Sequence, residues 1–235
     1  MAMAADRNQL TVYLMAGVAT ANQMFTECRR KLEEMLSRAE FEKPIVHVLY
    51  PYGDDSRSRL AQVLEVGSDL SNRIHLSRVG GRKAAEGIQR TYKGKGPVLM
   101  IGHSGGGIAA YQAAVKLYRE GTLPDFRLVQ IGSPRIRVMP ELKQRISYFH
   151  SVDAAGKLTD PISRIGTWGG WSGGGKMLIP HWNVWKYAPG YIEGIEVVGG
   201  HADYFKHQNP FIDGQAICNL DKTMDRVRQW LKGWI

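Results

Sequence analysis

The chain has 235 residues and a mass of 26.3 kDa, a length typical of one compact domain. Hydrophobic residues make up 43% of the sequence and charged residues 23%, which excludes an intrinsically disordered chain. No apolar run approaches the roughly 20 residues that a membrane-spanning helix needs, so the sequence predicts no such helix.

The formal net charge is +9, with a sequence pI of about 9.6, and the cations are spread along the chain. The densest segment, residues 73–95, holds 7 lysines and arginines against one acid, Glu86. We interpret it as the solvated face of a helix, with weak binding to an anionic membrane surface or a phosphate as the alternative. Because no motif that reads bases accompanies it, we expect no nucleic-acid partner.

The first residues resemble a signal peptide, since Arg7 precedes the apolar stretch 10–18 and residues 19–21 look like a cleavage site. However, Asp6 offsets Arg7, and the apolar stretch alternates as a strand does. We therefore expect a retained first strand and a cytoplasmic location. Cys28 and Cys218 fit no metal or redox spacing and are expected to be reduced thiols.

Short apolar runs then alternate with longer helical patterns, which is typical of βαβ units and a mostly parallel sheet. Strands are predicted over residues 10–16, 45–49, 98–101, 128–131, 146–149 and 192–198. Helices are predicted over residues 22–38, 106–120 and 220–234, with one or two more within 55–95. The pattern predicts a single α/β domain over residues 1–235, with about six strands flanked by helices.

Residues 102–106, Gly-His-Ser-Gly-Gly, match G-x-S-x-G, the pattern of a nucleophile elbow centred on Ser104. The glycines are needed because side chains two positions either side of the serine would collide with neighbouring backbone. The turn also aims the N–H of Gly105 at a developing oxyanion. Residues 170–174 fit the same pattern around Ser172, but no strand precedes them and no helix follows. Ser104 is therefore the candidate nucleophile.

A serine nucleophile needs an imidazole as general base and a carboxylate to orient it. His201 follows the strand predicted over 192–198 and two glycines, which would place it on a loop at the carboxyl edge of the sheet. Asp153 lies just past the strand predicted over 146–149, and Asp160 follows seven residues later. Spacing alone leaves both carboxylates open as the acid.

At this point the chain resembles the α/β-hydrolase superfamily, and within it the lipases and esterases, including class 3 lipases. The matching segments are 102–107, then Gly-Ser-Pro-Arg at 132–135, Asp-Pro-Ile-Ser-Arg at 160–164 and Gly-His at 200–201. The resemblance implies an α/β-hydrolase fold and favours Asp160 over Asp153 as the triad acid. It also implies a second oxyanion donor after the first strand, the N–H of Val18 or, failing that, Ala19.

Four of the six tryptophans lie between the proposed acid and base, in a glycine-rich segment, 165–190, that could cover the site. Trp168 and Trp171, with His103 beside the nucleophile, are the candidate substrate contacts. The alternative is that the indoles pack onto the sheet edge.

The sequence thus predicts a serine hydrolase that cleaves a small-molecule carboxylic ester with an apolar acyl group, without metal or organic cofactor. A thioesterase or amidase would use the same residues. The alternative from another class is a non-catalytic binding module that keeps the fold and binds a membrane or protein through its basic helices. The sequence does not indicate an oligomeric state.

Overall fold

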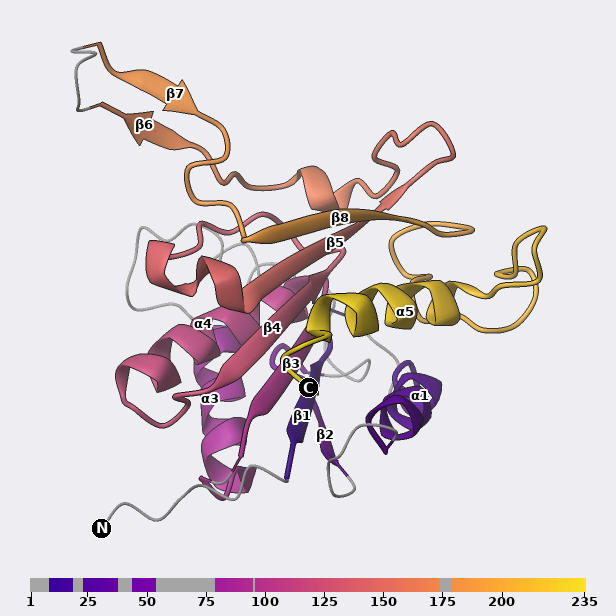
Figure 1. Ribbon diagram of the computed structural model, residues 1–235, viewed down its shortest axis with the longest axis horizontal. Coiled ribbons are helices and arrows are strands. Elements are labelled where there is room, and N and C mark those ends of the chain that lie inside the picture. Colours follow the sequence, from indigo (N-terminus) through magenta and orange to yellow (C-terminus); the bar gives the residue numbers. More distant parts are fainter. Residues whose placement is uncertain (1–8, 19–22, 38–43, 54–78, 95, 174–178) are drawn as a thin grey trace.

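The fold is built on a six-stranded parallel sheet, shown in Figure 1. A computed structural model describes residues 9–18, 23–37, 44–53, 79–94, 96–173 and 179–235. The strands of the sheet are β1 (Thr11–Met15), β2 (Ile45–Leu49), β3 (Val98–His103), β4 (Phe126–Ile131), β5 (Ile146–Val152) and β8 (Tyr191–Glu196). They lie in the order β2-β1-β3-β4-β5-β8, and each neighbouring pair is parallel. The predicted fold class is confirmed, and the six predicted strands are the strands of this sheet.

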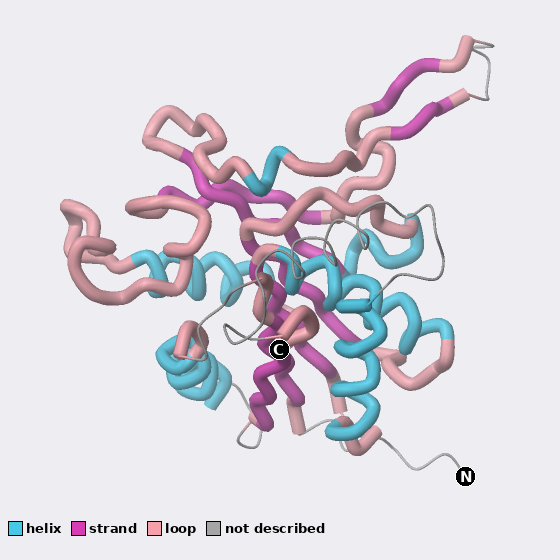
Figure 2. Tube along the Cα trace, turned by 180° about the vertical axis from the view of Figure 1, so that it is seen from behind, coloured by secondary structure: helices cyan, strands magenta, loops and turns pink. Residues whose placement is uncertain are grey.

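Helices cover both faces of the sheet (Figures 1 and 2). They are α1 (Thr26–Ser37), α3 (Val79–Thr91), α4 (Gly105–Arg119) and α5 (Asn219–Leu231). The α3 and α4 side chains belong to one hydrophobic core and those of α1 and α5 to another. Strand β3 contributes Met100 to the first core and Ile101 to the second, because successive side chains of a strand point to opposite faces.

The central strands β1 and β3 are mostly apolar because helices bury both of their faces. Every residue of β1 and β3 is buried, so the alternation of Thr11 and Tyr13 with apolar residues, which predicted a strand, does not mark an exposed face. Helix α5 is amphipathic, and Met224, Val227 and Leu231 point into the core, as their spacing predicts. Cys28 on α1 carries a free thiol beside the Met224 sulfur, and burial raises the pKa of this thiol.

The basic segment at 73–95 is partly described, since residues 54–78 and Lys95 lie outside the described residues. Within it, α3 buries Ala84 and Ile88 and leaves Arg82 and Arg90 exposed. This part of the segment is a solvated helix face, as expected. No helix in the described part of the chain is both long enough and apolar enough to cross a bilayer.

Three short features were not predicted from the sequence. Two are 3-10 helices, η1 (Pro140–Arg145) and η2 (Ile162–Arg164). The third is a separate hairpin of strands β6 (Gly170–Ser172) and β7 (His181–Asn183). The hairpin projects from the body beyond the edge strand β8 (Figure 1). A strand of three residues has too few positions for hydrophobic periodicity to reveal it.

Replacing a fully buried core side chain tests the packing of the sheet. Ile101→Ala removes a side chain with 0% exposure from the centre of β3 and should lower the free energy of unfolding by about 2 to 5 kcal/mol. The matched variant Ile217→Ala, at a position with 40% exposure, should change it by less than about 0.5 kcal/mol. Denaturant unfolding of the two variants makes the comparison, and equal losses would contradict the described core.

Candidate active site

Ser104 occupies a sharp turn between β3 and α4. Its backbone has φ 56° and ψ −132°, a left-handed conformation that costs a residue other than glycine about 1 to 3 kcal/mol. The Ser104 N–H donates to the carbonyl of Ile131 at 3.0 Å, which ties the turn to the end of β4. The serine is thus held at the carboxyl edge of the sheet, half-buried, with its hydroxyl outside the strand.

The glycines around Ser104 allow the backbone segments to approach each other. A Cβ on Gly102 would lie 2.5 Å from the Cα of Gly107, and one on Gly106 would lie 2.1 Å from the carbonyl oxygen of Met15 on β1. A larger residue at either position would therefore push α4 away from the sheet. The collisions expected from the G-x-S-x-G pattern are confirmed.

His201 lies in the loop after β8 and faces the serine. Its Nε2 is 2.9 Å from the Ser104 hydroxyl, although the two residues are 97 positions apart in the chain. Asp203 shapes this loop, since its carboxylate accepts the N–H of Gly200 at 2.8 Å. The loop thus presents the imidazole to a nucleophile that comes from a different strand.

Asp160 lies on the other side of the imidazole. Its two carboxylate oxygens are 3.1 and 3.0 Å from His201 Nδ1, and its side chain has 0% exposure. A carboxylate can only accept, so Nδ1 carries the proton and Nε2 is left free to accept the Ser104 O–H. The three side chains form one continuous line of hydrogen bonds.

Asp153, the alternative acid, is exposed and lies in a turn after β5. Its Oδ1 accepts the backbone N–H groups of Ala155 at 3.0 Å and Lys157 at 2.8 Å. The structure therefore brings Asp160, and not Asp153, to His201.

Asp160 is held in place by its own segment and by Tyr204. Its Oδ1 accepts the N–H of Ile162 at 2.8 Å, and its Oδ2 accepts the Tyr204 O–H at 2.8 Å. Burial alone would raise the pKa of this carboxyl group, but the bonds from His201, Tyr204 and the Ile162 N–H together hold it below its usual value. Tyr204 is a positioning residue that the sequence did not reveal.

Asn219, at the start of α5, fixes the loop that carries His201. This fully buried amide donates to the carbonyls of Val198 at 2.7 Å and Asp203 at 2.9 Å, and its oxygen accepts the Val198 N–H at 2.8 Å. Nothing in the sequence distinguishes it from an ordinary residue at a helix start.

His103, a candidate substrate contact from the sequence, lies beneath the base. Its ring stacks on the His201 ring with centroids 4.9 Å apart, and its Nε2 lies 2.9 Å from the His201 carbonyl oxygen, to which it must donate. Burial, and then the nearby His201 ring, lowers the pKa of His103 to about 4. With only 4% of its surface exposed, this neutral ring supports the base and is not a substrate contact.

The oxyanion donors can be placed in part. Gly105 is the first residue of α4, where backbone N–H groups have no partner within the helix. Gly17, after β1, lies against the turn, since a Cβ on it would be 2.7 Å from the Ser104 Cβ and 3.1 Å from the Gly105 nitrogen. Val18 follows it and is half-buried, whereas Ala19 lies outside the described residues.

The structure does not bring Trp168 and Trp171 to the triad. Trp168 is buried against Tyr148 of β5, with the ring centroids 4.8 Å apart, and Trp171 lies on the projecting hairpin. The segment 165–190 also rejoins the sheet at Tyr191, which pairs with Ser147 at the amino end of β5 and not at the carboxyl edge. Of the two alternatives for this segment, the described residues favour packing onto the sheet, because Trp168 is buried against β5 and the hairpin rejoins the sheet at the end away from Ser104.

No group of three or more His, Cys, Asp or Glu side chains among the described residues is arranged to hold a metal ion.

The two carboxylates can be compared directly. Asp160→Asn keeps the shape of the side chain but replaces the carboxylate with a neutral amide, whose NH2 group faces His201 Nδ1 or one of the other donors and favours the wrong imidazole tautomer, so hydrolytic turnover (kcat) should fall by roughly 10³- to 10⁴-fold. Asp153→Asn should leave kcat unchanged within about twofold, because that carboxylate only closes a turn. Both variants should show the circular dichroism of the wild type. A large loss in Asp153→Asn with none in Asp160→Asn would contradict the described geometry.

His103 should make stability depend on pH. Because its pKa is about 4 in the folded state and near 6.5 unfolded, the unfolded chain binds the extra proton first as the pH falls. The free energy of unfolding should therefore decrease by about 3 kcal/mol from this group between pH 6.5 and 4.

Urea unfolding of His103→Gln measures this contribution as a smaller decrease than in the wild type over the same pH range. The control His207→Gln, at an exposed histidine, should follow the wild type. Parallel curves for His103→Gln and wild type would show that His103 is not held neutral.

No protein-family model matches the chain, and no curated protein sequence matches it. Among solved structures, the product of the gene lin2722 from Listeria innocua is similar at 12% identity, over 96% of this chain and 94% of its own, with a TM-score of 0.51. RedJ, a thioesterase of prodiginine biosynthesis from Streptomyces coelicolor, is similar at 14% identity over 94% and 90%, with a TM-score of 0.49. ClbQ of the colibactin pathway is similar at 14% identity over 95% and 97%, also with 0.49.

The likeness to the Listeria protein spans nearly the whole of both chains and concerns the fold. Together with the parallel strand order β2-β1-β3-β4-β5-β8 and the serine at the turn after β3, it shows that this chain has the α/β-hydrolase fold.

Proposed function

We propose that this protein is a serine hydrolase that cleaves a carboxylic ester through an acyl-serine intermediate. The observation that carries the proposal is the line of hydrogen bonds from Ser104 through His201 to buried Asp160, with the serine on a strained turn. Ion pairs and hydrogen bonds are common in proteins, but this combination is what a serine nucleophile requires.

In the first half-reaction, His201 Nε2 takes the Ser104 proton while Oγ bonds to the ester carbonyl carbon. The carbonyl electrons move onto oxygen, where the N–H groups of Gly105 and Val18 stabilise the charge. When the carbon–oxygen bond to the leaving group breaks, the imidazolium returns its proton to the departing alcohol. Asp160 stabilises the imidazolium throughout, and its carboxylate remains ionised.

In the second half-reaction, water replaces the alcohol. His201 takes a proton from the water while the water oxygen bonds to the acyl carbon. When the second tetrahedral intermediate collapses, the bond from Ser104 Oγ to the acyl carbon breaks, and the imidazolium returns its proton to Oγ. The acid is released, and Ser104 and His201 are restored. The expected apolar acyl site depended on Trp168 and Trp171, which lie elsewhere, so the proposal names the ester and not the acyl chain.

Labelling with a fluorophosphonate tests the nucleophile. The wild-type chain should gain one adduct, located by mass spectrometry on Ser104, because His201 activates that hydroxyl alone. Ser104→Ala should abolish the adduct and lower p-nitrophenyl ester turnover by roughly three or more powers of ten. The matched control is Ser172→Ala, which removes the serine of the second G-x-S-x-G segment and should retain both the adduct and the turnover.

An unlabelled wild type would contradict the proposal and favour a non-catalytic binding module. Hydrolysis of an acyl thioester in parallel distinguishes the leaving groups. If kcat/KM is much larger for the thioester than for the matched oxygen ester, the proposed substrate becomes a thioester, and the proposed catalytic residues stay the same.

A further inference from the structure

The hairpin of β6 and β7, here called the Trp hairpin (described residues 169–173 and 179–186), projects from the body (Figures 1 and 2). From it we infer a function beyond ester hydrolysis: the Trp hairpin docks the protein onto a bilayer surface that contains anionic phospholipids.

The Trp hairpin is fixed to the body at its base. Trp185 lies 5.7 Å from the buried Trp168, measured between ring centroids, and the Trp182 ring lies so close to Gly169 that a Cβ there would be 2.5 Å from it. Trp171 is directly opposite Trp182 across the two strands, with centroids 5.7 Å apart in an edge-to-face pair. These contacts join the two strands to each other and the base of the hairpin to the body.

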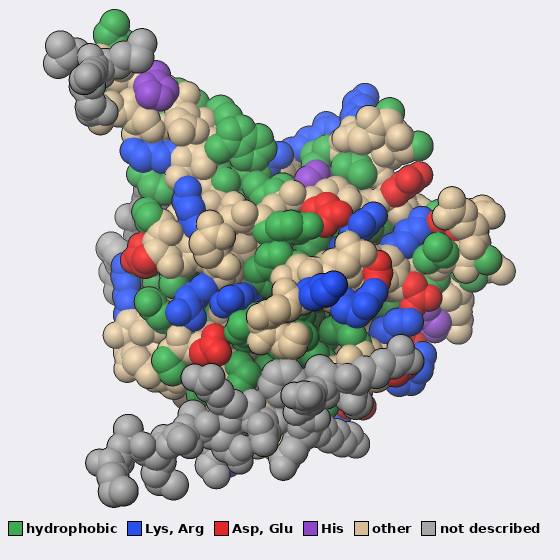
Figure 3. All heavy atoms as spheres, viewed as in Figure 1, with side chains coloured by type: hydrophobic (Ala, Val, Ile, Leu, Met, Phe, Trp, Pro, Cys, Tyr) green, Lys and Arg blue, Asp and Glu red, His purple; other side chains and the backbone are tan. Residues whose placement is uncertain are grey.

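Several large apolar side chains of the Trp hairpin are uncovered, beside the polar pair of Ser172 and His181. Trp171 is 64% exposed and Ile179 is 77% exposed, and Figure 3 shows the projection standing clear of the rest of the surface. The exposed set continues toward the base with Trp182, Val184 and Trp185. Adjacent exposed apolar side chains of this size are typical of a surface that binds a membrane or another molecule.

The charges at the base indicate which partner. Arg137 and Lys186 approach the Tyr187 ring to 5.5 and 5.3 Å, and the Lys143 ammonium donates to the Lys186 carbonyl at 2.8 Å. None of the ion pairs between described residues involves these three cations. The sequence from 161 to 190 contains no aspartate or glutamate. The base of the Trp hairpin therefore carries three cations with which no described carboxylate forms an ion pair.

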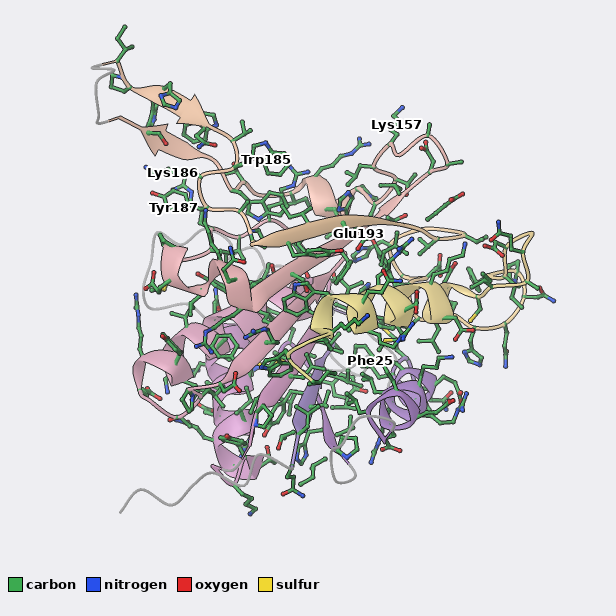
Figure 4. All side chains as sticks on the ribbon, in the orientation of Figure 1. Phe25, Lys157, Trp185, Lys186, Tyr187 and Glu193 are labelled. Atoms are coloured by element: carbon green, nitrogen blue, oxygen red, sulfur yellow. The ribbon has the colours of Figure 1, made fainter. Side chains whose placement is uncertain are left out.

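Exposed apolar side chains along the projection and cations at its base match the layers of an anionic membrane surface. Indole rings favour the boundary between acyl chains and headgroups, and lysine and arginine attract the phosphates above it. Figure 4 shows Trp185, Lys186 and Tyr187 where β7 rejoins the body, which is the level at which headgroups would lie. A narrow projection also suits insertion better than it suits a broad protein interface.

Docking in this way leaves the triad uncovered. The Trp hairpin rejoins the sheet at the amino end of β8, whereas Ser104 and His201 lie at the carboxyl edge. Membrane binding and hydrolysis are thus separable, and a variant that has lost Ser104 should still bind.

Cosedimentation of the full chain with vesicles tests the inference. The wild type should bind vesicles of phosphatidylcholine with phosphatidylglycerol, bind phosphatidylcholine alone at least about tenfold more weakly, and be released by high salt. Trp171→Ser and Ile179→Ser should each weaken binding by about three- to tenfold without changing the melting temperature, since both side chains are exposed. The matched control Ile217→Ser and the variant Ser104→Ala should bind as the wild type does.

Wild-type protein that stays in the supernatant, or a Trp171→Ser variant that binds like the wild type, would overturn the inference. So would sedimentation velocity that shows a dimer of the wild type, lost in Trp171→Ser, together with no vesicle binding, because the Trp hairpin would then be an interface between copies of this chain.

Discussion

The close approach of β1, β3 and α4 around Ser104 is the constraint on which the site depends. A Cβ at Gly102, Gly106 or Gly17 would meet backbone or Ser104 atoms at 2.1 to 2.7 Å, so the strained serine turn exists only because those side chains are missing. The strain costs local stability, and the packed sheet on both sides of the turn offsets it. As a result, the Ser104 hydroxyl is fixed at the carboxyl edge of the sheet, where His201 in the loop after β8 can reach it.

The electrostatics around the imidazole follow from two opposite arrangements. Asp160 is buried yet stays ionised, because Tyr204 and the Ile162 N–H donate to it in addition to His201. His103 is buried and stays neutral, so it supports the His201 loop without placing a second positive charge beside a protonated base. The buried carboxylate can stabilise an imidazolium that forms during turnover, and the neutral ring adds no charge that opposes it.

Much of the fold and of this site could be predicted because the signals are local. The strand 45–49 and the serine turn are visible in a few adjacent residues. Asp160, by contrast, was favoured over Asp153 only by the resemblance of residues 160–164 to class 3 lipases. Tyr204 and Asn219 could not be predicted, since their roles depend on partners brought near by the fold. The prediction of Trp168 and Trp171 as substrate contacts failed for a related reason. The sequence shows that these aromatic side chains are present but not where the fold places them.

The protonation state of the imidazole tests the central claim most directly. Nitrogen NMR of the chain labelled at histidine would show which nitrogen of His201 carries the proton in the neutral ring. The hydrogen bonds described here require the proton on Nδ1, facing Asp160, with Nε2 bare toward Ser104. A proton on Nε2, or the averaged tautomers of a histidine free in solvent, would contradict the account.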